Sequence, residues 1–305
     1  MTDSPESECE LWEEDPTLAE DVIGCGLLGL GTCTNLFSLI FFSTRRKTGP
    51  NEVLFIALNT VDLIICLYLV GAVPAIRELE IYYYFYRIYD LFFYLSTFIT
   101  CQLSAVRALV LHSPFLATSI KRWHIMASIA VFAVMLAAPF LINIDLFYKA
   151  ENVDTASTVY YAILSFIPVV VGLACSCLIF SALKRSSEQA MTADKRRATI
   201  TILVITITFL LFVVPYQVLL AVYIVTLNGC SLYAKELAHL VSLFARFGLP
   251  LNSTINALIY FTRIKELRLW VFKSWRFVTC RKPEVVFSTT VSTFETVRRD
   301  TTTTV

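Results

Sequence analysis

Long apolar stretches alternate with short polar segments along most of the chain. Seven stretches are long enough to cross a hydrocarbon core, which takes about 20 helical residues, and they cover residues 22–44, 53–76, 82–112, 125–147, 159–183, 198–227 and 237–261. Backbone groups in lipid must be hydrogen-bonded within their own segment, so we expect each stretch to be a helix. The pattern therefore predicts an all-α membrane protein, a seven-transmembrane helix bundle over residues 22–261.

The segments on either side of this bundle differ in character. Residues 1–21 are strongly acidic, whereas residues 281–305 are rich in Ser and Thr and are expected to form a tail without fixed structure. Over residues 262–280, basic residues are interspersed with apolar residues that fall on one helical face, namely Ile264, Leu267, Val271, Trp275 and Val278. This spacing predicts a short amphipathic eighth helix in contact with membrane lipids.

Composition and charge exclude several classes of function. Hydrophobic residues make up 57% of the 305 residues and charged residues 16%, against about 45–50% and about 25% in soluble domains. A net charge of +1 provides no basic field for a nucleic-acid partner. No internal repeat indicates a transporter, and no phosphate loop, HExxH motif or pair of catalytic groups indicates an enzyme.

The basic residues indicate which way the chain is inserted. Residues 1–44 contain no Lys or Arg, and the first basic cluster is Arg45-Arg46-Lys47. Further clusters lie at residues 121–122, at both ends of an expected loop over residues 184–197, and from Arg263 onward. All of them lie on one side if seven helices alternate in direction. The positive-inside rule makes that side cytoplasmic and the N-terminus extracellular. The plasma membrane is the expected location.

The polar residues inside the expected helices form a series of short motifs. In chain order they are Asn35, residues 58–62 (LNTVD), residues 103–107 (LSAVR), Pro168, residues 209–216 (FLLFVVPY) and residues 252–260 (NSTINALIY). These motifs resemble those of rhodopsin-like (class A) G-protein-coupled receptors, and the resemblance covers all seven helices and the eighth. It implies a receptor that transmits an extracellular ligand signal, a chemosensory cue among the candidates, to heterotrimeric G proteins and that is bound by arrestin.

The resemblance implies a sodium pocket in the middle of the bundle. Asp62 would be its central carboxylate, and the surrounding oxygen donors would be Ser96, Asn252, Ser253 and Asn256. The chemistry agrees, because a buried carboxylate needs a cation or a proton, and hard oxygen ligands suit Na⁺. The alternative is a protonated Asp62 in an ordinary hydrogen-bonded cluster. No other metal is expected.

The resemblance also assigns roles in activation and G-protein coupling to Arg107, Pro215, Asn256 and Tyr260. The chain departs from the family pattern at Val106, which replaces the usual acidic residue. Val106 cannot pair with Arg107, which suggests a lowered activation barrier; the opposite interpretation is that coupling has weakened. Ala108, Val213 and Ala257 are further departures. They favour the alternative of a receptor-fold protein that does not couple and acts as a scavenger or a dimerisation partner.

A ligand cavity is expected between the extracellular halves of the helices. Its expected lining is Tyr86, Tyr89, Asp90, Tyr216, Gln217 and Arg246. One hypothesis is a small anionic, lipid or nucleotide-like ligand held by Arg246, because related receptors often keep a basic residue there. The alternatives are an internal pair of Arg246 with Asp90 or Glu236, and a peptide or basic ligand drawn to the acidic N-terminus.

Few cysteines lie where a disulfide could form. Near the oxidising side the chain has only Cys9, Cys25 and Cys230. Their pairing is open, and a free Cys9 is the alternative to a bridge. Cys280 follows the amphipathic helix and is either a palmitoylation site or an unmodified juxtamembrane cysteine.

The tail over residues 281–305 offers two kinds of partner. Its hydroxyl groups could be phosphorylated to recruit arrestin. The ending Thr303-Thr304-Val305 fits a peptide that adds as a strand to a PDZ-type domain, with Val305 in the pocket. Both interactions would take place in the cytoplasm.

Overall fold

The computed structural model describes residues 18–45, 49–75, 82–143, 153–185, 192–226, 237, 240–241 and 244–278. Every regular element in these residues is a helix. They are α1 (Leu18–Ser43), α2 (Pro50–Ala75), α3 (Tyr82–His112), α4 (Pro114–Ser119), α5 (Arg122–Asn143), α6 (Val153–Arg185), α7 (Ala193–Thr226), the π-helical turn η1 (Phe244–Gly248), α9 (Leu249–Arg263) and α10 (Lys265–Val278). The all-α prediction is confirmed for this part of the chain.

Within the described residues, five helices contain a segment that is long and apolar enough to cross a membrane. These segments are Val22–Ser43, Pro50–Tyr68, Leu91–His112, Phe166–Arg185 and Lys195–Leu219, in α1, α2, α3, α6 and α7. In α5 the apolar segment Arg122–Ala138 is shorter, and α9 has 15 residues. The chain is therefore a multi-pass helical membrane protein.

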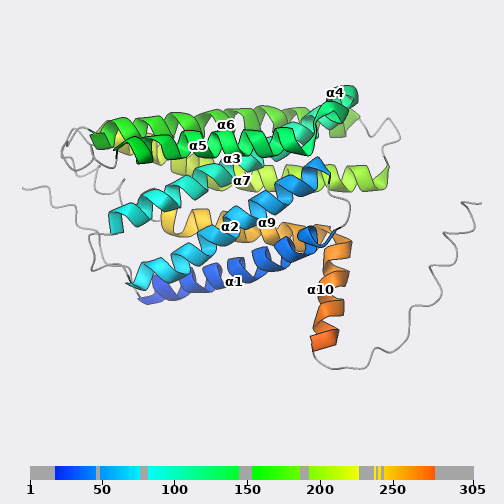
Figure 1. The fold of residues 1–305 in the computed structure, drawn as a ribbon, viewed down its shortest axis with the longest axis horizontal. Helices are drawn as coiled ribbons and strands as arrows, with labels where there is room; N and C mark the ends of the chain where they lie inside the picture. Colours follow the sequence, from blue (N-terminus) through cyan, green and yellow to red (C-terminus); the bar gives the residue numbers. More distant parts are fainter. Residues whose placement is uncertain are drawn as a thin grey trace, which may run out of the picture. The chain divides into compact units, whose positions relative to one another are not determined.

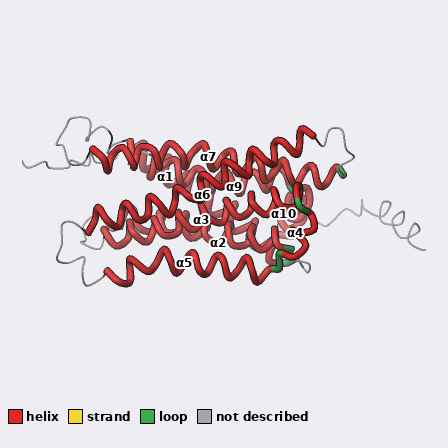
Figure 2. The backbone as a smooth tube through the Cα atoms, turned by 90° about the horizontal axis from the view of Figure 1, so that it is seen from above, coloured by secondary structure: helices red, strands yellow, loops and turns green. Residues whose placement is uncertain are grey.

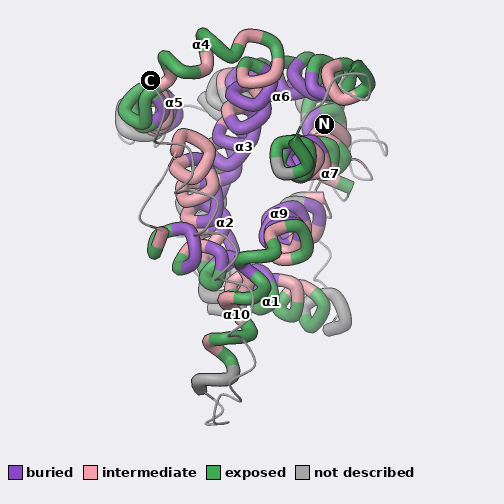
Figure 3. Tube along the Cα trace, turned by 90° about the vertical axis from the view of Figure 1, so that its right-hand side faces the viewer, coloured by how far each residue is buried: buried purple, intermediate pink, exposed green. Residues whose placement is uncertain are grey.

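The helix α3 lies at the centre of the bundle. It contacts α2, α5, α6 and α7, while α9 contacts α1, α2 and α7, and these helices run side by side (Figure 1, Figure 2). Viewed along the helices, buried residues follow α3 and recur on α2 and α9 (Figure 3). This arrangement brings polar residues of α2, α3, α7 and α9 into one interior.

The interior of the bundle contains polar residues among its apolar ones, and its outer surface carries many exposed apolar side chains. Asn35, Asn59 and Thr100 are fully buried, whereas Leu211 and Val134 are 66% and 68% exposed. Because lipid tails are as apolar as leucine, exposed apolar side chains on the spans face hydrocarbon, and hydrogen bonds between helices help to hold the bundle together. This is the burial pattern of a membrane protein.

Two local features differ from the expectations. The helix α7 begins at Ala193, so Lys195, Arg196 and Arg197 lie in its first turns and not in a loop that extends to residue 197. A short helix, α4, follows α3 and begins with Pro114, at a position where the missing amide hydrogen leaves no helical bond unmade. Six residues are too few to show an apolar periodicity, so the sequence pattern does not predict α4.

The described residues from Glu266 to Val278 belong to a unit distinct from the one that contains the bundle. The helix α10 covers most of the predicted amphipathic segment 262–280. Leu267 is buried, while Leu269, Phe272 and Trp275 are more than half exposed. Exposed apolar side chains on a helix that also carries basic residues suit a membrane surface.

Candidate functional site

Asp62 lies at the centre of a buried hydrogen-bond cluster. Ser96 Oγ donates to Asp62 Oδ1 at 2.8 Å, and Ser253 Oγ donates to the same atom at 3.1 Å. Asn256 Nδ2 donates to Asp62 Oδ2 at 3.3 Å. All of these residues are at most 3% exposed. The structure therefore brings together Asp62 and three of the oxygen-bearing residues predicted to surround it.

Asn252 is the remaining residue predicted for this cluster. It is buried on α9, and its Oδ1 has no hydrogen-bond partner among the described residues. The Oδ1 of Asn256 is likewise without a partner in the part of the chain that the structure describes. Two buried amide oxygens of α9, on Asn252 and on the Asn256 that bonds to Asp62, are thus left to accept a hydrogen bond or to bind a cation.

Helix register explains why these residues meet. Asp62 lies on α2 and Ser96 on α3, the helix with which α2 packs. Ser253 and Asn256 are three residues apart on α9 and therefore share one helical face. The cluster consequently depends on the relative rotation of three helices.

The helix α1 packs closely against α9, the helix that carries Ser253 and Asn256 of the Asp62 cluster. A Cβ atom added to Gly31 would lie 2.5 Å from Thr254 Oγ1 and 2.7 Å from Cys66 Sγ, so only glycine lets the helices come this near. Small residues allow such contacts between helices in membranes. Asn35 Nδ2 then donates to the carbonyl oxygens of Gly31 at 2.9 Å and Ser253 at 3.3 Å.

The chemistry of the Asp62 cluster fits a small monovalent cation. The side chains bonded to the carboxylate are neutral, and an uncompensated buried charge is unfavourable. Carboxylate, hydroxyl and amide oxygens are hard ligands of the kind that Na⁺ prefers. The residues that would hold Na⁺ are Asp62, Ser96, Asn252, Ser253 and Asn256. A proton on Asp62 is the alternative, because it also removes the charge.

The second buried charge, Arg107, is bonded from α3 to α7. Its Nε donates to Thr199 Oγ1 at 2.8 Å, and its Nη2 donates to the same hydroxyl and to the backbone carbonyl of Lys195. Thr199 Oγ1 itself donates to that carbonyl at 2.7 Å. Arg107 is 5% exposed. Its acceptors are one turn apart on α7, so Arg107 ties two helix ends together.

The groups that accept hydrogen bonds from Arg107 in the described part of the chain are neutral oxygen atoms. Val106, the residue before it, is buried and apolar. Hydrogen bonds from a cation to neutral acceptors are weaker than those to a carboxylate. Among the described side chains, the link between α3 and α7 is therefore a polar contact to neutral acceptors.

Tyr260 lies in an aromatic cluster formed by α1, α2 and α9. Its ring centroid is 5.9 Å from that of Phe42 and 5.0 Å from that of Phe55, both edge-on, and Phe42 stacks on Phe55 at 5.1 Å. The Tyr260 hydroxyl is buried and has no hydrogen-bond partner among the described residues. An unsatisfied buried hydroxyl costs about 1–3 kcal/mol, so a rearranged bundle could improve the environment of Tyr260.

The residues predicted to line a ligand cavity are described in part. Pro215 lies inside α7, Tyr89 and Gln217 are buried, and Tyr216 packs edge-on against Phe93 with ring centroids 5.7 Å apart. Outside the described residues lie the side chains of Tyr86, Asp90, Glu236 and Arg246. The anionic-ligand hypothesis and its alternative, an internal pair of Arg246, both stay predictions.

The predicted disulfide, lipidation and PDZ positions are described only at Cys25, which is exposed on α1 and forms no disulfide with another described cysteine. Outside the described residues lie Cys9, Cys230, Cys280, Thr303 and Val305. Their modification and binding stay predictions.

The structure adds two residues that sequence reasoning did not find. Thr199 accepts from Arg107, and a signal for it exists, since Thr199 and Thr206 are seven residues apart and share one face of α7. Phe115 is 87% exposed on α4, directly after the end of α3 that carries Arg107. In the sequence, only the Ser113-Pro114 pair, a helix-start signal, indicates the short helix α4 that carries Phe115.

The two buried clusters are the features from which a function can be argued. A scan against protein-family models and a search of curated proteins found no match to this chain. The residue pattern and the geometry around Asp62 and Arg107 are therefore the basis for a functional proposal.

Proposed function

We propose that the chain is a seven-helix receptor, similar to the rhodopsin-like G-protein-coupled receptors, that transmits an extracellular ligand signal to heterotrimeric G proteins. The observation that carries the proposal is the buried cation Arg107 on the central helix α3, bonded to the first turns of α7. A charged residue inside a membrane span is costly and is a functional candidate by default. Here it joins two helices that would have to separate to admit a partner.

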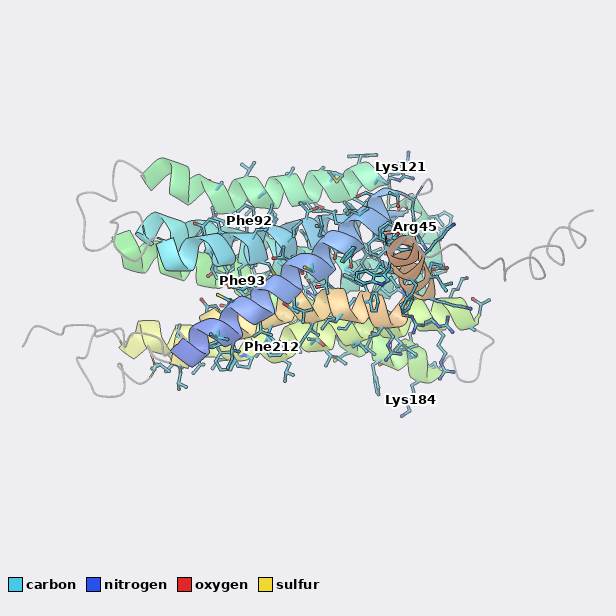
Figure 4. All side chains as sticks on the ribbon, turned by 90° about the horizontal axis from the view of Figure 1, so that it is seen from below. Arg45, Phe92, Phe93, Lys121, Lys184 and Phe212 are labelled. Carbon is cyan, nitrogen blue, oxygen red and sulfur yellow. The ribbon has the colours of Figure 1, made fainter. Side chains whose placement is uncertain are left out.

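The proposal needs seven crossings in a defined orientation. Besides the long apolar segments, α5 and the pair η1–α9 would supply the remaining two, overlapping the stretches 125–147 and 237–261. Arg45, Lys121 and Lys184 lie at one end of the bundle (Figure 4). By the positive-inside rule this end is cytoplasmic and the N-terminus is extracellular. The plasma membrane is the expected location.

Movement of α7 away from α3 would turn the Arg107 cluster into a docking surface. Separation breaks the bonds to Thr199 and to the Lys195 carbonyl and frees the guanidinium to bind a G-protein segment. The exposed ring of Phe115 extends the same end of the bundle and offers an apolar anchor. Because the acceptors are neutral, the barrier to separation is lower than it would be for an ion pair.

The Asp62 cluster would hold Na⁺ in this proposal. When bound, the ion supplies the positive charge that the neutral partners of the carboxylate lack. Ser96 and Ser253 orient the carboxylate from two different helices, so occupation favours the arrangement in which α2, α3 and α9 are packed together. A protonated Asp62 would hold the same helices without any dependence on sodium.

The extracellular ligand is proposed to be small and anionic, lipid-like or nucleotide-like, with Arg246 as its charged partner. Arg246→Gln should then abolish the response to such a ligand and leave ligand-independent activity unchanged. If Arg246 instead pairs internally, the same substitution lowers the amount of folded receptor, because it leaves a buried acid without its partner.

The experiment that tests the proposal is ligand-independent activation of each Gα class in cells. Wild type, Arg107→Ala and the control Arg122→Ala are compared at matched surface expression; Arg122 is an exposed basic residue at the start of α5. Activity above background that is lost in Arg107→Ala and kept in Arg122→Ala supports receptor coupling. Equal activity in Arg107→Ala and wild type would remove Arg107 from the mechanism.

A receptor-fold protein that does not couple is the second candidate, and the buried, apolar Val106 favours it. Such a scavenger or dimerisation partner would keep Arg107 bonded to α7 permanently. It would activate no Gα class even after Thr199→Val removes the hydroxyl that accepts from Arg107. Activation by that variant alone would instead indicate a receptor that is silent until its ligand binds.

A further inference from the structure

The short helix α4 and the long helix α5 meet at an exposed serine. Ser119 is the last residue of α4, and only two residues separate it from Arg122, the first residue of α5. The Ser119 side chain is exposed, and its hydroxyl donates to the carbonyl oxygen of Leu116 at 2.7 Å. This hydroxyl is therefore accessible to an enzyme that modifies the surface of the protein.

The helix α4 is only weakly held in its folded form. None of its six residues is buried, and Phe115 and Leu116 are 87% and 56% exposed. A helix of this length gains little stability from its own hydrogen bonds, since isolated helices shorter than about 12 residues are marginal in water. Segments with few buried contacts open locally at a small cost in free energy. The chain around Ser119 can therefore unwind and extend into the cleft of an enzyme.

The sequence around Ser119 is basic. Lys121 and Arg122 follow it by two and three residues and are both exposed, and residues 91–144 contain no Asp or Glu. Protein kinases select their substrates by charge patterns of this kind, and an exposed serine beside two basic side chains suits a kinase with an acidic substrate groove. Lys121 lies at the basic end of the bundle (Figure 4). The proposed orientation puts this end in the cytoplasm, where ATP and kinases are present.

A phosphate on Ser119 would act in opposite directions on the two helices. It carries a charge of about −1.5 to −2 at pH 7. At the end of α4 this charge meets the negative end of the helix dipole, which destabilises α4. Directly before α5, a helix of 22 residues, the same charge meets the positive end of the dipole and the side chains of Lys121 and Arg122. Phosphorylation should therefore unwind α4 and strengthen the first turn of α5.

The residue before α5 cannot accept hydrogen bonds from the first turn of that helix. Lys121 occupies this position, and its ammonium group is a donor only. The backbone N–H of Lys121 donates to His124 Nδ1 at 3.0 Å, and the His124 N–H donates to the Lys121 carbonyl oxygen at 3.1 Å. The first amide hydrogens of a helix have no acceptor within the helix, and phosphate oxygens bind well to them. A phosphate on Ser119 would supply the acceptor that the Lys121 side chain does not provide.

We propose that Ser119 is a phosphorylation site for a protein kinase that recognises basic residues. Ser119 Oγ attacks the γ-phosphorus of ATP, the bond from that phosphorus to the β-phosphate oxygen breaks, ADP leaves, and the hydroxyl proton passes to the catalytic base of the kinase. Lys121 and Arg122 then hold the phosphate at the start of α5 while α4 unwinds. Unwinding displaces Phe115, the apolar anchor at this end of the bundle, and lowers Gα activation. This effect and the cytoplasmic location rest on the proposed function.

Wild-type protein in detergent micelles, where both ends of the bundle are accessible, tests the site itself. The protein is incubated with ATP and the catalytic domain of a Ser/Thr kinase that recognises basic residues, and mass spectrometry measures the phosphate on each serine. Ser43 is the matched control in the same molecule, because it is exposed and two arginines follow it at the spacing of the basic pair after Ser119. Its surroundings are fixed, since Phe41 and Phe42 are buried and Arg45 lies 4.7 Å from the Phe41 ring centroid.

Ser119 should be phosphorylated about tenfold or more faster than Ser43, because the rate of modification follows the population of the opened segment. In the phosphorylated protein, amide hydrogen exchange should become faster over residues 113–119 and slower over residues 122–126. The double substitution Lys121→Gln and Arg122→Gln should slow phosphorylation of Ser119 and leave that of Ser43 unchanged. Absence of phosphate on Ser119, equal rates for the two serines, or unchanged exchange over both segments overturns the proposal.

Cells that express the same kinase domain separate this inference from the proposed function. Phosphate on Ser119 of the wild type, together with higher Gα activation by Ser119→Ala, supports the site and its effect. Phosphorylation in micelles but not in cells would show that this end of the bundle is not cytoplasmic, which overturns the proposed orientation and the cellular role of the site together. Equal Gα activation by Ser119→Ala and the phosphorylated wild type overturns the effect on coupling, whereas Arg107→Ala separately tests coupling itself.

Discussion

Asp62 and Arg107 are both buried inside membrane spans, yet the bundle holds them in different ways. Asp62 accepts hydrogen bonds from two other helices, α3 and α9. Arg107 donates to a single helix, α7, through one hydroxyl and one carbonyl oxygen. The groups bonded to either charge in the described residues are neutral.

The difference determines what happens to each cluster when a helix moves. A displacement of α7 leaves the bonds around Asp62 in place but breaks those described for Arg107. The Asp62 cluster is therefore expected to stabilise the bundle, whereas the Arg107 cluster is expected to respond to its rearrangement. Substitutions at the two clusters should separate these roles.

The largest effect is expected from Asp62→Ala. It leaves the donors of Ser96, Ser253 and Asn256 without an acceptor, and each such loss costs about 1–3 kcal/mol in a buried site. The thermal unfolding midpoint in detergent should fall by several degrees. Asp62→Asn, which keeps an accepting oxygen, should lose much less; equal midpoints for Asp62→Ala and wild type would contradict the structural role.

A smaller loss of stability and a gain of activity are expected from Thr199→Val. The change removes the hydroxyl that accepts from Arg107 at little change in volume and should cost about 2 kcal/mol, while basal Gα activation rises. The matched control is Thr201→Val, because the Thr201 hydroxyl donates to the Arg197 carbonyl of the same helix. A similar rise in activity for both variants would show that Arg107 is not the cause.

Sodium should change the free energy of unfolding by a smaller amount than these substitutions, and only through the Asp62 cluster. At ten times its dissociation constant, Na⁺ bound at Asp62 raises the free energy of unfolding by about 1.4 kcal/mol, measured as a midpoint shift against N-methylglucamine chloride. Asp62→Asn should abolish the shift and Thr199→Val should keep it. If wild type shows no shift at any sodium concentration, Asp62 is held by a proton.

The smallest loss of stability is expected from Ser104→Ala. Ser104 lies on α3 between Ser96, which belongs to the Asp62 cluster, and Arg107. A single hydrogen bond between membrane helices contributes about 0.6 kcal/mol on average, and this change removes the bond to Thr206. Ser176→Ala serves as the control, since the Ser176 hydroxyl donates to the Gly172 carbonyl within α6. A double-mutant cycle with Thr206→Val isolates the pair, and a coupling energy of zero would mean that the two hydroxyls do not interact.

The apolar pattern predicts the helices better than their ends. The bounds of α3 coincide with the apolar stretch 82–112, whereas α1, α6 and α7 begin four to six residues before the stretches predicted at 22, 159 and 198. The reason is that hydropathy stops at the first charged residues, while backbone hydrogen bonding continues through them. Glu20 and Asp21 lie within α1 for this reason.

The candidate site was predictable to the extent that each residue belongs to a motif within one helix. Asp62, Ser96, Ser253 and Asn256 follow from the resemblance, and the structure joins them. The packing of Phe42 and Phe55 around Tyr260 does not follow, because Phe and Leu give the same apolar signal to a sequence pattern. The close approach of Gly31 to Thr254 does not follow from the sequence either, since it depends on how tightly two helices pack.

By itself, the sequence determined that this protein is a bundle of membrane helices with charged residues buried in its spans, because hydrophobic length and charge are properties of the linear chain. Only the tertiary structure decided what those charges contact. Arg107 meets Thr199, 92 residues away, and not Thr201 or Thr208 on the same helix. The rotation of α7 about its axis selects among these hydroxyls, and that rotation results from packing against α3, α6 and α9 together.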